Sequence, residues 1–429
     1  MNLLIKGGRV IDPSQDLDDY LDILIEDGLI SRIAPHIEQE GVPVIEAAGK
    51  IVVPGLIDMH CHLRDFNEAH KETIASGTRA AALGGFTTCV CEPNTDPPLD
   101  TPQAVEQWIN RAERDACVNL YTKVCLTKER KGKQLVNLKA LAHRPWVVAA
   151  TDDGNPVVSD IVMERAFVRA RESELLLTPH CEESPATIQT FQQQNPLIPL
   201  AEEIAHYKRE PYYVARDLKL AEKTSWRVHI SHVSMAASLD LIKQARARWV
   251  PVTCEATPHH LTLTEKDAEK CGPDAKTNPP LRQKDDVKAL QQGLRDGTID
   301  VIASDHAPHA PHEKARGWET APMGAIGLET TLGVVLTHLV HPGIITLSQA
   351  IELMSTNPAR ILGLPGGSLS IGKPADITII DLEKKWVVDP SRFASKGRNT
   401  PFKGWRLQGS AFATIVGGKM VMKAEELLV

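Results

Sequence analysis

The sequence has no run of residues suited to cross a membrane, and its N-terminus lacks an export signal. No stretch reaches the ~18 consecutive apolar residues of a membrane-spanning helix. Only three apolar residues, Leu3 to Ile5, precede Lys6, which is too few for the core of a signal peptide. We therefore expect a cytoplasmic protein that acts away from membranes.

An excess of positive charge is also missing. The 429 residues include 48 Lys and Arg against 55 Asp and Glu, a formal net charge of −7. Because proteins that grip phosphate backbones need a basic face, this balance argues against nucleic acid as a partner. No G-x-G-x-x-G or G-x-x-x-x-G-K-[ST] motif follows a predicted strand, so the usual dinucleotide- and nucleotide-binding loops are excluded.

Cysteine is scarce, with eight in the whole chain. A chain of this length buries a large core without disulfides, so we interpret the cysteines as reduced core residues. Cys61 and Cys181 stand beside histidines, and a metal-thiolate role for them is the less favoured alternative.

Both ends of the chain are rich in short strand patterns. Residues 21–27 and 29–34 alternate apolar and polar side chains around an Asp27-Gly28 turn. Similar patterns occupy residues 375–382, 386–388, 413–416 and 419–422, the last two joined by Gly417-Gly418. We predict that residues 1–53 and 366–429 form one small β-sandwich domain, with a main domain of residues 54–365 inserted between them.

Eight apolar, β-rich runs alternate with helical patterns in the middle of the chain. Continuous apolar strands separated by amphipathic helices indicate a parallel sheet covered by helices, and eight units favour a closed (β/α)8 barrel over an open doubly wound sheet. The runs are residues 51–58, 86–91, 118–126, 146–151, 174–179, 226–231, 250–255 and 299–304.

Several of these runs end in residues that bind metals, at the strand ends where barrels of this kind carry their chemistry. His60 and His62 are two residues apart on an extended strand, so both imidazoles point to the same side. Later runs end in Asp152 and Asp153, His180, His232, and Asp305. Four histidines with two or three carboxylates exceed the needs of one tetrahedral ion, so we predict a two-metal site.

A two-metal site of this composition predicts hydrolysis. Asp152 or Asp153 is the candidate to bridge the ions, which imidazole and carboxylate ligands favour as zinc, with manganese, cobalt or iron as alternatives. A water bridging two zinc ions would supply hydroxide at neutral pH. Asp305 would bind one ion and act as acid/base, or would only complete the ligand set.

These residues lie in motifs that resemble the amidohydrolase superfamily and, within it, the class I bacterial dihydroorotase family. The likeness runs through almost the whole chain in the family's order. The motifs are PGLIDMHCHLR (54–64), EPNT (92–95), TDDG (151–154), HCEE (180–183), HISHVS (229–234), EATPHHL (255–261), NPPLR (278–282), SDHAPH (304–309) and SKGRNTPF (395–402).

The resemblance implies a role for each metal-binding residue. One zinc ion would be held by His60, His62 and Asp153, and the second by His180, His232 and the same Asp153, with Asp305 as the acid/base. We choose Asp153 over Asp152 because the second aspartate of the pair carries this role in similar sequences. Many relatives bridge their metals with a carboxylated lysine, but no lysine lies between positions 139 and 208.

The resemblance further implies the reversible cyclisation of N-carbamoyl-L-aspartate to L-dihydroorotate in pyrimidine biosynthesis. Arg64 would bind the substrate carboxylate as a bidentate fork. Asn94, His309 and, less strongly, Asn278 would complete the substrate site, under a loop from Asp305 to Gly324. The family has a Pro-Gly turn after HLR, whereas residues 65–70 of this chain contain neither proline nor glycine. This difference leaves the pose of Arg64 open.

Two other functions stay open at this point. One is another cyclic amidohydrolase (a hydantoinase, dihydropyrimidinase or allantoinase), against which Arg64 and the missing lysine argue. The other is a non-catalytic partner of aspartate carbamoyltransferase, against which the complete ligand set argues. We expect a homo-oligomer. Because some relatives require aspartate carbamoyltransferase for full activity, that enzyme is a candidate partner.

Overall fold

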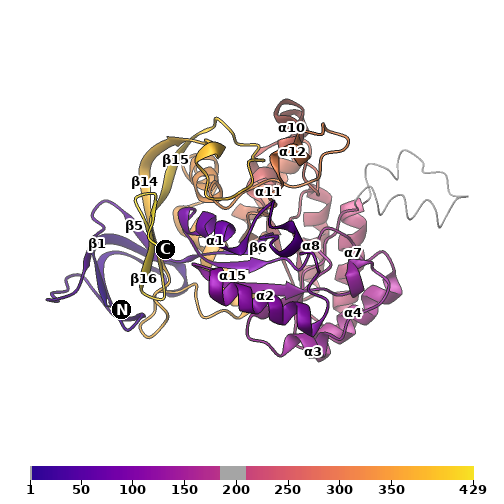
Figure 1. Cartoon of the computed structure of the whole chain (residues 1–429), viewed down its shortest axis with the longest axis horizontal. Coiled ribbons are helices and arrows are strands. Elements are labelled where there is room, and N and C mark those ends of the chain that lie inside the picture. The colour runs from indigo at the N-terminus through magenta and orange to yellow at the C-terminus, as the bar shows by residue number, and fades with distance from the viewer. Residues whose placement is uncertain (1, 184–208) are drawn as a thin grey trace, which may run out of the picture.

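The computed structural model describes residues 2–183 and 209–429, which form a barrel of parallel strands and a separate sheet beside it (Figure 1). The barrel strands follow one another in chain order from β6 to β13, and each neighbouring pair is parallel. A parallel bridge from Cys61 to His306, just beyond β13, brings the end of the series beside its beginning. The strands are β6 (Leu56–Cys61), β7 (Phe86–Cys91), β8 (Asn119–Val124), β9 (Val147–Ala150), β10 (Leu176–Leu177), β11 (Val228–Ile230), β12 (Val252–Ala256) and β13 (Val301–Ile302). The predicted barrel is confirmed, with one barrel strand in each of the eight runs.

Helices cover the outside of the barrel strands (Figure 1). They are α1 (Ile74–Leu83), α2 (Pro102–Asp115), α3 (Leu138–Ala142), α4 (Asp160–Glu172), α7 (Arg209–Thr224), α8 (Ala236–Ala247), α9 (Pro258–Thr262), α10 (Glu265–Cys271), α11 (Lys284–Arg295), α12 (Pro311–Lys314), α13 (Thr331–Val335), α14 (Leu347–Ile351) and α15 (Asn357–Leu362). In α2 the buried side chains Val105, Trp108, Ile109 and Ala112 recur at helical spacing, so one face packs on the barrel. The side chain of Thr101 caps the start of this helix.

The first predicted run, residues 51–58, is two strands rather than one. Residues Ile51–Pro54 form β5 in the outer sheet, and the chain crosses into the barrel at Gly55. A Cβ atom at Gly55 would lie 2.0 Å from Oγ1 of Thr87, so only glycine allows this close passage. The continuous apolar character of the run hides the crossing, because both of its strands are buried.

The outer sheet joins the two ends of the chain, as predicted. It has nine strands in the order β17-β16-β15-β14-β5-β1-β2-β3, with β4 beside β1. They are β1 (Leu3–Asp12), β2 (Leu17–Glu26), β3 (Leu29–Ala34), β4 (Val44–Glu46), β14 (Ile377–Val387), β15 (Arg406–Val416), β16 (Lys419–Lys423) and β17 (Glu426–Leu427), together with β5. The two predicted turns at 27–28 and 417–418 join β2 to β3 and β15 to β16. The strands form one continuous hydrogen-bonded sheet with its own apolar core, which includes Ile23, Val52 and Ile377.

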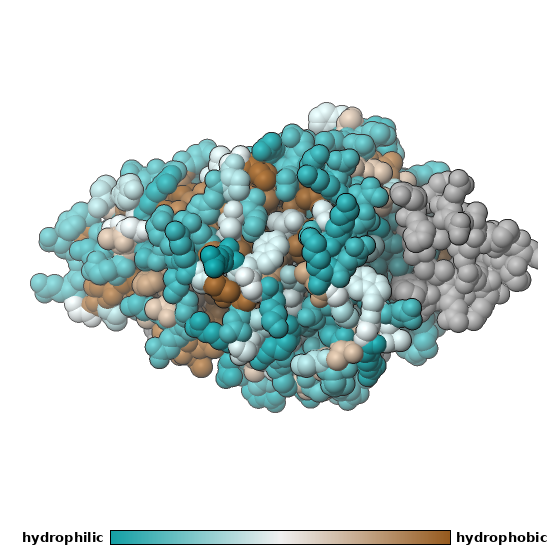
Figure 2. Space-filling model, turned by 90° about the horizontal axis from the view of Figure 1, so that it is seen from above, coloured by the Kyte–Doolittle hydropathy of each residue, from teal (hydrophilic) through white to brown (hydrophobic). Residues whose placement is uncertain are grey.

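The surface seen in Figure 2 is mostly hydrophilic, with apolar residues scattered in small areas. Among the helices in the described part of the chain, none combines the length and apolar character needed to span a bilayer.

Candidate metal centre and active site

Two histidines at the end of β6 face the carboxylate of Asp153, which follows β9. The Nε2 atom of His60 lies 3.5 Å from Oδ1 of Asp153, and Nε2 of His62 lies 3.6 Å from Oδ2. All three side chains are buried. The alternation along an extended strand places both imidazoles on the inner side of the barrel, as the i, i+2 spacing predicts.

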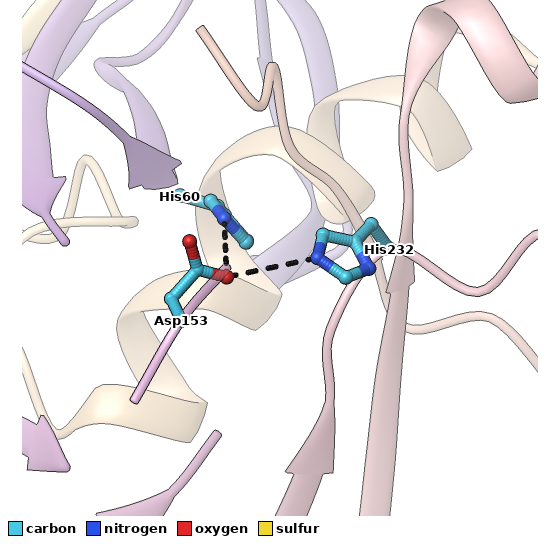
Figure 3. Close-up of side chains that lie close together, drawn as sticks. All are labelled: His60, Asp153 and His232. Atoms are coloured by element: carbon cyan, nitrogen blue, oxygen red, sulfur yellow. Dashed lines mark ion pairs between the residues drawn. The ribbon is translucent and has the colours of Figure 1, made fainter. Parts of the chain in front are cut away.

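Two further histidines, from later barrel strands, contact the same carboxylate. His180 follows β10 and places Nδ1 3.4 Å from Oδ1 of Asp153, while His232 follows β11 and places Nε2 3.7 Å away. Figure 3 shows the ion pairs that one carboxylate oxygen of Asp153 makes with both His60 and His232. Three of the four histidines therefore meet Oδ1 of Asp153, and His62 meets Oδ2.

The geometry of these groups fits a metal. Two sets have ligand atoms close enough to share an ion, namely His60 with Asp153 and His232, and His60 with His62 and Asp305. Nε2 of His60 and Oδ1 of Asp153 are buried without a hydrogen-bond partner among the described residues. Burying such atoms unpaired is costly, whereas a divalent ion with imidazole and carboxylate ligands would satisfy them.

The neighbouring Asp152 faces away from this site. Its carboxylate accepts hydrogen bonds from the backbone N–H groups of Leu126 (2.8 Å) and Thr127 (3.0 Å), and from the Thr127 hydroxyl. The residue pattern alone leaves both aspartates open. In the structure, Asp153 is the one directed at the histidines.

Asp305 lies at the edge of the cluster, beyond β13. Its Oδ1 atom is 3.1 Å from Nε2 of His62 and 3.6 Å from Nε2 of His60. Burial alone would raise the pKa of Asp305, but the hydrogen bond from His62 and the nearby His60 and His232 bring it well below its usual value. The carboxyl group is therefore ionised at neutral pH.

Glu255, on β12, supports the metal-facing histidines from behind. Its carboxylate lies 2.6 Å from Nδ1 of His60 and 3.2 Å from Nε2 of His229, and it accepts the backbone N–H of His232 at 3.2 Å. Because Nδ1 of His60 donates to this carboxylate, the lone pair of Nε2 faces Asp153. The sequence analysis assigned Glu255 no role, although its place at the end of the seventh strand was an available signal.

A buried ion pair joins Lys123 on β8 to Glu92, at the end of β7. Both side chains are fully buried, and Oε1 of Glu92 lies 3.7 Å from Nε2 of His60. Burial lowers the pKa of Lys123, but Glu92 and Glu255 raise it above its usual value. This pair was not predicted from the sequence, where the signal was a lysine inside a predicted barrel strand.

The predicted substrate residues fall into two groups. Asn94 and Asn278 contact metal-facing histidines: the first accepts from Nδ1 of His62 at 2.9 Å, and the second places its amide 2.9 Å from Nε2 of His180. Arg64 and His309 lie on loops beside the cluster. The Arg64 guanidinium is buried and donates through Nε to the Pro308 carbonyl at 3.3 Å, with no ion pair in the described part of the chain.

The loop that carries His309 is held by the C-terminal tail. Asn399 accepts the backbone N–H of His309 at 3.1 Å and donates to the carbonyls of Ala307 and Gly324, each at 3.0 Å. Nε2 of His309 also lies 2.8 Å from the Met323 carbonyl. One buried side chain thus ties both ends of the loop predicted to cover the substrate.

A cavity of about 730 Å³ lies beside Asn278 and Met323. Asn278 is the one predicted site residue on its wall, and the metal-facing histidines do not line it.

Comparisons with known proteins identify a family and relatives for this chain. The chain matches the amidohydrolase family over residues 51–421. A protein named dihydroorotase from Pelotomaculum thermopropionicum is 46% identical over 99% of this chain and 99% of its own length. Another protein of that name, from Acetivibrio thermocellus, is 42% identical over 99% of this chain and its full length.

Solved structures share the fold over the whole chain. The L-hydantoinase (dihydropyrimidinase) from Arthrobacter aurescens has a TM-score of 0.89 and 29% identity, covering 100% of this chain and 97% of that one. The dihydropyrimidinase from Brevibacillus agri has a TM-score of 0.87 at 23% identity, covering 100% and 96%, a likeness of fold.

Proposed function

The chain belongs to the amidohydrolase family, and from that premise we propose that it is a dihydroorotase. It interconverts N-carbamoyl-L-aspartate and L-dihydroorotate, a step of pyrimidine biosynthesis. The observation that carries this function is the similarity, at 42–46% identity over nearly the full length, to proteins named dihydroorotase. The buried Arg64 beside the metal-facing cluster supports it, because the substrate bears a carboxylate that needs a cation.

The enzyme uses a metal cofactor, and we propose two zinc ions. His60, His62 and Asp153 would hold one, and His180, His232 and Asp153 the other, with Asp305 beside them. When bound, the ions would polarise the ring carbonyl and make a water molecule acidic enough to act at neutral pH.

In this proposal Asp305 moves the proton. As water adds to the ring carbonyl carbon, Asp305 takes the proton that the water releases. The bond between that carbon and the ring nitrogen then breaks, and Asp305 returns the proton to the nitrogen. Ring closure is the reverse sequence, through the same transition state.

The chain's other residues orient the substrate. The two terminal nitrogens of Arg64 would bind the carboxylate in a bidentate fork, with His309 beside it. Asn94 and Asn278 would contact the substrate from positions next to His62 and His180, which their amide groups also hold in place.

We also propose that the protein is a cytoplasmic homo-oligomer able to bind aspartate carbamoyltransferase. The proposed barrel domain comprises residues 54–365, and the small β domain residues 1–53 and 366–429. Size measurement by light scattering, alone and with a carbamoyltransferase, tests the assembly.

The second candidate is an amidohydrolase of neutral rings, favoured by the 29% identity to the Arthrobacter hydantoinase. To separate the two, zinc-loaded protein is assayed with L-dihydroorotate, hydantoin, dihydrouracil and allantoin. Turnover of dihydroorotate alone is the expected result, whereas turnover of only a neutral ring contradicts the proposal. If all four fail with metal bound, the assay is repeated with a carbamoyltransferase.

A further inference from the structure

The chain leaves β6 through three consecutive residues with left-handed backbone angles. The φ angles of Arg64, Asp65 and Phe66 are 53°, 60° and 46°. Residues other than glycine adopt such angles at a cost in free energy, and Asp65, with ψ of −164°, lies in a region occupied almost only by glycine. A run of this kind persists only where the surroundings hold it, so its supports indicate what it is for.

The Asp65 carboxylate is the main support. Only 4% exposed, it accepts the backbone N–H of Phe66 at 2.6 Å and that of Ile74, the first residue of α1, at 3.0 Å. It also pairs with Arg111, from α2. The guanidinium of Arg111 lies 4.5 Å from the centre of the Phe66 ring, which it covers. Both unusual residues are therefore clamped by one arginine from a neighbouring helix.

Because Asp65 pairs with Arg111, it does not pair with Arg64, the residue before it. Arg64 is 8% exposed. Within the described part of the chain its guanidinium donates one hydrogen bond, to the Pro308 carbonyl. An aspartate next in sequence would be a ready counter-ion for Arg64, but Asp65 turns away and is paired with Arg111. The left-handed run thus separates two adjacent, oppositely charged side chains.

We infer that Asp65, held by Arg111, is a positioning residue that directs Arg64 at the substrate carboxylate. This inference rests on the proposed function, because only a carboxylated substrate gives Arg64 an anion to bind. Neither Asp65 nor Arg111 touches the substrate in this account. Their effect passes through the backbone of residues 64–66.

The test compares Asp65→Asn and Arg111→Met with wild-type, metal-loaded enzyme. Asparagine keeps the shape but loses the charge, and methionine keeps an aliphatic cover over Phe66 without the ion pair. Each should raise the KM for L-dihydroorotate about tenfold, the size expected from a weakened charged hydrogen bond, while kcat and zinc content change less than about twofold. Arg111 is more exposed than Asp65, so Arg111→Met decides the question if Asp65→Asn does not fold.

The matched control is another arginine-aspartate pair from α2. Arg114 pairs with Asp115 at 2.7 Å, one turn further along α2 and on the surface. Arg114→Met and Asp115→Asn should leave KM unchanged. An equal rise in KM in these controls would overturn the inference.

A double-mutant cycle with Arg64→Met separates positioning from a general structural role. If Asp65 acts through Arg64, Asp65→Asn should add little to the KM of the Arg64→Met variant. Additive effects, or an unchanged KM in the single variants, would reject the inference while leaving the dihydroorotase activity standing. If wild-type enzyme turns over only neutral rings, the proposed function fails, and the inference fails with it.

Discussion

The two ends of the active site are built in different ways. At the metal end, His60, His62, Asp153, His180 and His232 sit at or directly after barrel strands, and their ring nitrogens and carboxylate oxygens face one another. At the anion end, Arg64 and His309 sit on loops. The metal end is organised by the strands themselves, and the anion end by residues distant in the sequence.

The side chains at the two ends are held in position in different ways. Parallel strands in register deliver their end residues to one place, so the metal-facing side chains need little further support beyond carboxylates such as Glu255. Loops have no such register, and the chain holds them with Asp65, Arg111 and Asn399 instead. We therefore expect substitutions at the metal end to affect kcat or metal binding, and those at the anion end to affect KM.

The largest effect should come from Asp305→Ala. Without a group to move the proton, kcat should fall by about 10²- to 10⁴-fold while zinc binding stays close to wild type. Steady-state kinetics and metal analysis of the purified variant measure both. The control is Asp296→Asn, which changes the carboxylate of the residue that follows α11. Retained turnover in Asp305→Ala would remove the acid/base role.

Glu255→Gln should come next, with a loss of zinc affinity. The amide cannot hold His60 and His229 as a carboxylate does, and outer partners of this kind are worth about 10- to 100-fold in metal affinity. Competition with a chelating dye measures the affinity. Glu329→Gln is the control, because Glu329 accepts the N–H groups of Ala394 and Ser395 instead of supporting a metal-facing histidine. Equal loss in both variants would mean that Glu255 acts only on general stability.

Arg64→Lys should raise the KM for L-dihydroorotate by about tenfold and leave zinc content unchanged. An ammonium supplies a charge but not the planar fork, so part of the binding is lost. The KM for a poor neutral substrate such as dihydrouracil, where turnover is detectable, should not change. An unchanged KM for dihydroorotate would place the carboxylate elsewhere.

The smallest effect should follow from Asn399→Ala. Three backbone groups of the His309 loop would each lose a hydrogen bond, although the Gly324 carbonyl keeps its bond from Lys314. We expect a cost of about 1–3 kcal/mol in stability and a KM that rises a few-fold. Asn357→Ala removes the side-chain hydrogen bonds that Asn357 makes with the Asp300 carbonyl and with Arg360, outside the His309 loop, and should reduce stability without changing KM. Urea unfolding and steady-state kinetics on both variants make the comparison. A fall in kcat alone for Asn399→Ala would break the proposed division between the two ends.

Several features of the fold and the site could be predicted from the sequence. The periodic apolar runs predicted the barrel, and the joining of the two chain ends into one sheet followed from their matching strand patterns. The H-x-H spacing predicted that His60 and His62 face one side. The split at Gly55 escaped prediction because two adjacent buried strands have the same apolar character as one.

The supports of the site could not be predicted in the same way. Glu255 meets His60 across 195 positions, Asn399 meets His309 across 90, and Asp65 meets Arg111 across 46. No local period or motif records such pairs, because each depends on how separate elements pack.

The sequence by itself determined the barrel, the outer sheet and the residues that stand at the strand ends. Hydrophobic periodicity and strand register act locally, and they bring end residues together wherever parallel strands close. The resemblance already favoured Asp153 over Asp152, and the tertiary structure shows how Asp153 faces the histidines. Only the tertiary structure decided that Glu255 holds His60 and that Asp65 pairs with Arg111 instead of the adjacent Arg64. These choices depend on backbone direction and on contacts between distant segments, which exist only after the chain has packed.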